Sequence, residues 1–142
     1  MAQKTGSMEY GTAGDQDRSP ALAGVTYRLG DPRTVRQIFL TINDRVGPAG
    51  RQPFEVFITT AEARQFGWLA ALARVISALL RRGVDPAPLA RELAEIRDPV
   101  GGRHAPDGRW IPSLAAEIGL CLEQHLRRCR TSAAASSVRQ AG

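Results

Sequence analysis

Residues 66–83, FGWLAALARVISALLRRG, decide the fold. Seven large apolar residues recur at the spacing of three and four residues that marks one face of a helix: Trp68, Leu69, Leu72, Val75, Ile76, Leu79 and Leu80. Arg81 and Arg82 fall where cations suit the negative end of a helix dipole, and Gly83 can adopt the left-handed conformation that ends a helix. The stretch therefore predicts a central buried helix.

Two more helices are predicted after it. Asp85 can accept hydrogen bonds from the first free amides of a new helix, and Pro86 fits its first position. Residues 87–96 then form a short amphipathic helix that packs on the first one. Pro112-Ser113 opens a last helix that we expect to run to about Leu126, with its inner side made by Leu114, Ile118, Cys121 and Leu122.

Three strands are predicted before the central helix. Residues 25–29 alternate apolar with polar, as a half-buried strand does, and residues 38–42 are apolar on both faces, as a central strand is. Residues 54–58 form the third, with Glu55 and Phe57 on the face opposite the other apolar side chains. Between them lies NDRVGPAGRQP, residues 43–53, whose two glycines and two prolines predict a long hairpin loop with Asn43-Asp44 as turn formers.

The predicted fold class is therefore α+β: a three-stranded antiparallel meander packed against a long central helix and two further helices. Residues 1–23 and 127–142 lack apolar periodicity and are expected to be disordered tails on a domain that spans residues 24–126. Residues 98–111 carry three glycines and two prolines and form a loop. Anion binding is one interpretation of this loop, because it contains Arg103, His104 and Arg109. The alternative is a plain connection, since the pattern matches no phosphate-binding motif.

Composition limits the classes of partner. The chain has a net charge of +5, but residues 25–126 hold 13 arginines against 11 acids, so most of the excess lies in the four arginines after Leu126. A basic tail leaves weak nucleic-acid binding as a minor alternative. No apolar run is long enough to cross a membrane, and residues 1–24 hold no apolar segment of the secretory kind. We expect a cytoplasmic protein with no membrane partner.

Few residues point to chemistry. His104 and His125 have no nucleophile motif beside them, so no catalytic residue is expected. Glu55, an acid between apolar strand residues, is expected to pair with an arginine such as Arg74 on the covering helix. Cys121, His125 and Cys129 supply at most three ligands from one helix, so no metal site is expected, and Cys129 is interpreted as a free thiol in the mobile tail.

The two tryptophans differ in what the sequence predicts for them. Core packing is the better interpretation of Trp68, which lies in the central helix. Trp110 stands in a loop beside Ile111, where a buried position and an exposed partner site are equally well supported.

Three segments together resemble a known family: TINDRVGPAGRQPFEVFI at residues 41–58, ALARVISALLRRGVDP at 71–86 and WIPSLAAEIG at 110–119. They are similar to the TSCPD domain, a small domain found at the C-terminal end of adenosylcobalamin-dependent (class II) ribonucleotide reductases and on short separate chains. The resemblance covers about residues 25–126. Where many members have Thr-Ser-Cys-Pro-Asp, this chain has Ile111-Pro112-Ser113-Leu114-Ala115, so the cysteine is missing.

The resemblance implies an accessory or regulatory module in deoxyribonucleotide synthesis, which docks on a larger catalytic ribonucleoside-diphosphate reductase chain. It implies that adenosylcobalamin sits on that partner and that no cofactor binds here directly. The candidate docking surfaces are the loops at residues 43–53 and 98–112, with the candidate residues Asn43, Asp44, Glu55, Arg103, Arg109 and Trp110. The alternative is a stand-alone interaction module, which would form a homo-oligomer through Trp110 and its apolar neighbours.

Overall fold

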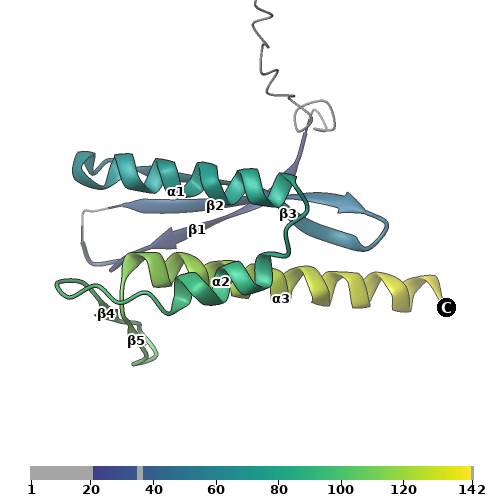
Figure 1. Ribbon diagram of the computed structural model, residues 1–142. Helices are drawn as coiled ribbons and strands as arrows, with labels where there is room; N and C mark the ends of the chain where they lie inside the picture. The colour runs from purple at the N-terminus through teal and green to yellow at the C-terminus, as the bar shows by residue number, and fades with distance from the viewer. Residues whose placement is uncertain (1–20, 35–36, 142) are drawn as a thin grey trace, which may run out of the picture.

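The computed structural model describes residues 21–34 and 37–141. It confirms the α+β class, with the helices against one face of an antiparallel sheet (Figure 1). The described elements, in chain order, are β1 (Ala23–Leu29), β2 (Ile38–Gly47), β3 (Gly50–Thr60), α1 (Ala63–Arg81), α2 (Pro86–Ala94), β4 (Arg103–His104), β5 (Trp110–Ile111) and α3 (Leu114–Gln140). The expectation for the N-terminal tail falls mostly on residues 1–20, which lie outside the described residues.

Strands β1, β2 and β3 pair in that order as an antiparallel meander, as predicted. The predicted loop at residues 43–53 is wrong, because β2 continues to Gly47 and β3 begins at Gly50, with only a tight turn between them. The outer part of this hairpin extends beyond the core and needs no apolar pattern, so its polar sequence did not indicate strands. The register shifts after Asn43, which leaves Phe54 as the extra residue of a β-bulge.

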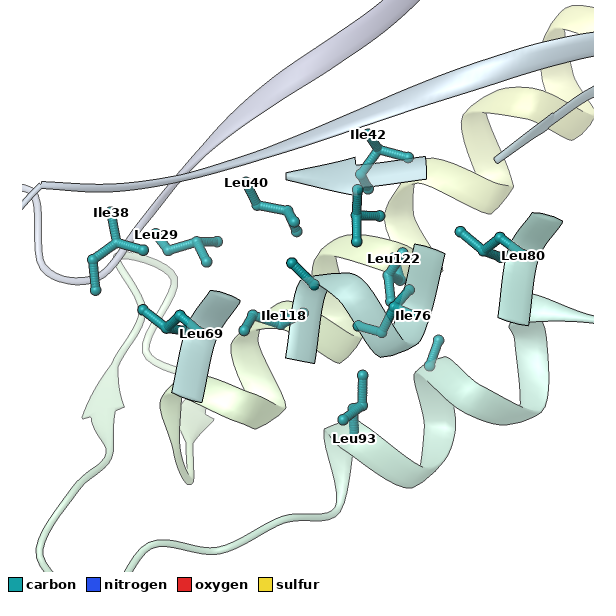
Figure 2. Close-up of a cluster of buried hydrophobic side chains, with 13 residues drawn as sticks. Leu29, Ile38, Leu40, Ile42, Leu69, Ile76, Leu80, Leu93, Ile118 and Leu122 are labelled. Atoms are coloured by element: carbon teal, nitrogen blue, oxygen red, sulfur yellow. The ribbon is translucent and has the colours of Figure 1, made fainter. Parts of the chain in front are cut away.

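The core lies between one face of the sheet and the helices. Figure 2 shows side chains of β1 and β2 that point toward side chains of α1 and α3. The labelled members of this cluster are Leu29, Ile38, Leu40, Ile42, Leu69, Ile76, Leu80, Leu93, Ile118 and Leu122. Burial of this apolar surface is the main term that stabilises the domain.

Helix α1 is central, but its buried face differs from the predicted one. Trp68 and Val75 are 40% and 57% exposed, whereas Ala73 and Ser77 are buried. The reason is that α1 also packs along β3, the edge strand, so the buried stripe is rotated toward small residues that permit close approach. The core position predicted for Trp68 is therefore wrong.

Helices α2 and α3 begin as predicted. Asp85 accepts a hydrogen bond from the amide of Ala87, with Pro86 next to it, and Ser113 accepts one from the amide of Ala116. Helix α3 does not end near Leu126, however, but continues to Gln140, so residues 127–140 form helix rather than the expected disordered basic tail. That segment is rich in good helix formers such as alanine and arginine and lacks an apolar stripe, which is why periodicity missed it.

Among the described residues, no helix combines the length and the apolar character needed to cross a bilayer.

Candidate functional site

A chain of polar side chains, buried at its centre, joins β1, β2 and α3. The hydroxyl of Tyr27 lies 2.9 Å from Nδ1 of His125, and Nε2 of the same ring lies 2.7 Å from Oδ1 of Asp44. Oδ2 of Asp44 accepts from Nε of Arg51 at 2.8 Å. His125 is 1% exposed and Asp44 3% exposed, so this network is part of the interior.

The local fold explains how these groups meet. Side chains of β2 alternate between the two faces of the sheet, and those of Leu40 and Ile42 face the core. Asp44, two residues after Ile42, faces the same way. His125 and Cys129 are four residues apart on α3 and therefore share one helix face. Cys129 Sγ donates to Oδ2 of Asp44 at 3.9 Å, and one donor atom each from Asp44, His125 and Cys129 lie within 4.8 Å of one another.

The electrostatics argue against a reactive thiol at this centre. Burial is the largest cause that raises the pKa of Cys129, and the carboxylate of Asp44 raises it further. Burial also raises the pKa of Tyr27, against the opposing effect of Arg128. Because the thiolate and not the thiol is the nucleophile, Cys129 is not poised for covalent catalysis.

A cavity of about 390 Å³ opens beside this network. It lies between the β2–β3 hairpin, the turn from α1 to α2 and the second half of α3. Cys129 and Arg51 line it and connect it with the buried centre, while Phe54 and Leu126 give it apolar walls. The guanidinium carbon of Arg45, which also lines the cavity, lies 5.4 Å from the centre of the Phe54 ring.

Glu55 is buried and ion-paired, as expected, but its partner is different. Its Oε2 accepts from Arg81 at 3.0 Å, and Oε1 accepts from the side-chain amide of Asn43, also at 3.0 Å. The expectation of Arg74 is therefore wrong, because Arg81 in the last turn of α1 is the arginine beside this end of β3. With Asp44 and Glu55 both buried, neither carboxylate faces a partner in this conformation.

The other predicted site residues gather at the small hairpin of β4 and β5. Arg103 is paired with Glu117 of α3, and Arg109 with Asp107 at 2.7 Å. The backbone amide of Arg109, and then its guanidinium, lower the pKa of Asp107. These ion pairs neutralise Arg103 and Arg109, two of the residues for which the sequence left anion binding as an alternative.

Trp110 is 55% exposed, so of its two predicted environments the structure favours the surface one. Its ring meets His104 edge to face at 5.0 Å between centroids. It also lies against Gly102, which has a φ of +99° and no room for a side chain, because a Cβ there would come within 2.5 Å of the indole.

Sequence reasoning missed the meeting of Asp44 with His125 and Cys129. The signal for half of it was present, since residues 125 and 129 have the spacing of one helix face. Asp44 was interpreted as a turn former, and the carboxylate becomes inward-facing only because β2 continues through it. That pairing is set by the tertiary structure.

Taken together, the fold and the site define a small α+β domain with a buried polar centre made by Asp44, His125 and Cys129. The model of the TSCPD domain family matches residues 14–126, which is most of the chain, and the chain belongs to that family. The family supports an association with ribonucleotide reductase-type proteins. Neither the curated proteins nor the solved structures that were searched contain a match.

Ser113, in the segment that the sequence analysis compared with the Thr-Ser-Cys-Pro-Asp motif, has a structural role here. Its hydroxyl donates to the carbonyl of Ile96 at 2.6 Å and accepts from the amide of Ala116. The serine thus ties the start of α3 to the segment after α2. It caps the N-terminus of α3.

Proposed function

We propose that this domain is an accessory or regulatory module that docks on a larger, adenosylcobalamin-dependent ribonucleotide reductase chain and takes part in deoxyribonucleotide synthesis. The observation that carries the proposal is the family match, because residues 14–126 include the sheet, α1, α2 and the first half of α3. In this proposal the partner supplies the cofactor and the radical chemistry.

The two cysteines support assigning the redox chemistry to the partner. Cys121 and Cys129 are eight residues apart on α3, so a rise of 1.5 Å per residue separates their Cα atoms by about 12 Å. A disulfide requires Cα atoms within roughly 7 Å of each other. Burial also raises the pKa of both thiols, to about 11 for Cys121. These thiols do not form an intramolecular dithiol relay while α3 is intact.

The docking surface that fits this role is a groove between α1 and the edge strand β3, which we call the Phe57 groove. Phe57, Phe66, Ala70 and Arg74 are among the residues that line it. Phe57 and Phe66 are 49% and 58% exposed, which is unusual for two phenylalanines so close together. Phe57 also belongs to the outer face of the sheet, opposite the helices, where it pairs with Thr41 of β2.

Co-purification from co-expressing cells tests the proposal. A tagged copy of the full chain is produced together with a class II reductase chain that lacks its own domain of this kind, and the expected result is a complex that survives size-exclusion chromatography. Reductase activity is then measured with and without the module. Separate elution of the two chains at micromolar concentrations would contradict docking.

Sedimentation of the isolated protein separates the proposal from the stand-alone alternative. An accessory module is expected to sediment as a free monomer that shifts when the reductase chain is added. A stable homo-oligomer that ignores the reductase would favour an independent interaction module and reject the docking proposal.

A further inference from the structure

Three side chains with metal-ligating chemistry meet beneath the sheet: the carboxylate of Asp44, the imidazole of His125 and the thiol of Cys129. All three are more than nine-tenths buried. Oxygen, nitrogen and sulfur donors together are typical of zinc, which binds carboxylate, imidazole and thiolate alike. We propose that these three residues form a binding site for a divalent transition-metal ion of the zinc class.

The spacing of the donors is close to what such an ion requires. A tetrahedral zinc ion with bonds of about 2.0–2.3 Å holds its donor atoms roughly 3.3–3.8 Å apart. Here Nε2 of His125 lies 2.7 Å from Oδ1 of Asp44, and one donor atom from each of the three residues lies within 4.8 Å of the other two. Side-chain shifts of about 1 Å would bring these separations into the range that the ion requires.

The surrounding hydrogen bonds orient two of the donors. In one tautomer of His125, Nε2 donates to Asp44 and Nδ1 accepts a hydrogen bond from the Tyr27 hydroxyl. In the other tautomer the ring proton is on Nδ1 and is donated to the Tyr27 oxygen. The lone pair of Nε2 is then free to bind a metal. Arg51 holds Oδ2 of Asp44 and leaves Oδ1 as the ligand atom. Metal-binding histidines normally have such a partner on the second nitrogen.

Access and charge are also suitable. Cys129 and Arg51 line the 390 Å³ cavity, so an ion can approach the centre from there and take its fourth ligand, a water or a small anion, on that side. A dication bound by one carboxylate and one thiolate has no net charge, so the neighbouring Arg51 does not exclude it. The thiol proton is released to solvent when the metal binds.

Cobalt is the probe that tests the site, because a cobalt–thiolate bond gives a near-ultraviolet charge-transfer band. Untagged full-length protein is stripped of metal with a chelator and titrated with Co²⁺. We expect one equivalent to bind, with that band and the strong visible bands of tetrahedral coordination, and we expect Zn²⁺ to displace it. Absence of the thiolate band from the folded protein would overturn the proposal.

Matched cysteine variants identify the ligand. Cys129→Ser should lose the thiolate band and the rise in melting temperature that Zn²⁺ gives the wild type, whereas Cys121→Ser should keep both. The opposite result for Cys121→Ser would overturn the assignment even where Cys129→Ser fails to fold. Tyr27→Phe keeps every donor, and we expect it to weaken Co²⁺ binding about tenfold through loss of ring orientation. None of these measurements involves a partner chain, so they test the metal site separately from docking.

Discussion

At the residue scale, single hydroxyls and carboxylates complete this small domain. Ser77 of α1 is the clearest case, because its Oγ accepts from the amide of Val56 at 2.9 Å and donates to the carbonyl of Val56 at 3.1 Å. Both groups belong to β3, the edge of the sheet, where no further strand pairs with them. One serine therefore satisfies the buried edge of a strand that would otherwise leave a donor and an acceptor unpaired.

Replacing Ser77 with alanine should destabilise the protein by about 1–3 kcal/mol, because both backbone groups of Val56 lose their partner in a buried place. Urea unfolding followed by circular dichroism measures the change. Ser137→Ala, at an exposed serine near the end of α3, is the control and should change stability by less than about 0.5 kcal/mol. Equal effects of the two substitutions would contradict this account.

Cys121 provides a prediction about pH. Burial raises its pKa from 9.0 to about 11, and Glu117 adds to the effect. At pH 8 the thiolate fraction is then roughly a hundredfold below that of an ordinary cysteine, so alkylation of the native protein by iodoacetamide should be at least that much slower and should accelerate up to about pH 11. Mass spectrometry of the labelled peptide follows the rate. Labelling at pH 8 as fast as in the urea-unfolded chain would show that the site is open.

The same shift sets the sign of a stability effect. The unfolded chain releases the thiol proton near pH 9.0, before the folded protein does near 11. The contribution of this thiol is therefore fully present below pH 9 and is lost as the pH rises toward 11.

At the element scale, α2 and α3 pack closely against each other. Gly119 of α3 faces the backbone of α2, and a Cβ there would lie 2.5 Å from the carbonyl oxygen of Ala90 and 2.6 Å from the amide nitrogen of Ala94. Backbone atoms cannot rotate away as a side chain can. The small residue thus sets how near the two helices pack, and through them where the second half of α3 lies.

Gly119→Ala should destabilise the protein by about 1–3 kcal/mol, because α2 must move away from α3 to admit the methyl group. Gly67→Ala on α1 is the matched control, since a Cβ there meets nothing within 4 Å. It should be neutral or stabilise by up to about 1 kcal/mol through helix propensity. Thermal unfolding of both variants checks the pair, and a Gly119→Ala variant as stable as Gly67→Ala would refute the close contact.

At the scale of the whole molecule, the apolar core lies on one face of the sheet, where side chains of β1 and β2 pack against the helices (Figure 2). The opposite face carries Phe39 and Phe57 among threonines, and Phe57 also lines the Phe57 groove between β3 and α1. A domain with one covered face and one apolar groove is suited to attachment to a larger body. This is the geometric basis of the proposed docking.

Phe57→Glu should weaken association with the reductase chain at least tenfold and leave the fold intact, because the side chain is already 49% exposed. Val138→Glu, at a residue 74% exposed near the end of α3, should bind as the wild type does. Biolayer interferometry measures both affinities, and circular dichroism confirms folding. Unchanged affinity of Phe57→Glu would move the docking surface elsewhere, with the hairpin that bears Trp110 next to be tested.

How far sequence reasoning reached depended on whether a feature was local. The starts of α2 and α3 were predicted correctly because Asp85-Pro86 and Pro112-Ser113 bond to amides only two or three residues away. The ends of β2 and α3 were not predicted, because both lie in polar sequence without an apolar pattern. The end of β2 depends on pairing within the β2–β3 hairpin, and the end of α3 depends on helix propensity. The candidate site was not predicted, because the sequence assigned Asp44 to a turn.

The sequence alone determined the α+β class, the order of the strands and the family, because apolar periodicity and capping residues act over a few neighbours. Only the tertiary structure decided that Glu55 meets Arg81 and that Asp44 meets His125. Those partners are 26 and 81 residues apart, and no short-range pattern records which distant side chains a β-bulge and a helix face bring together.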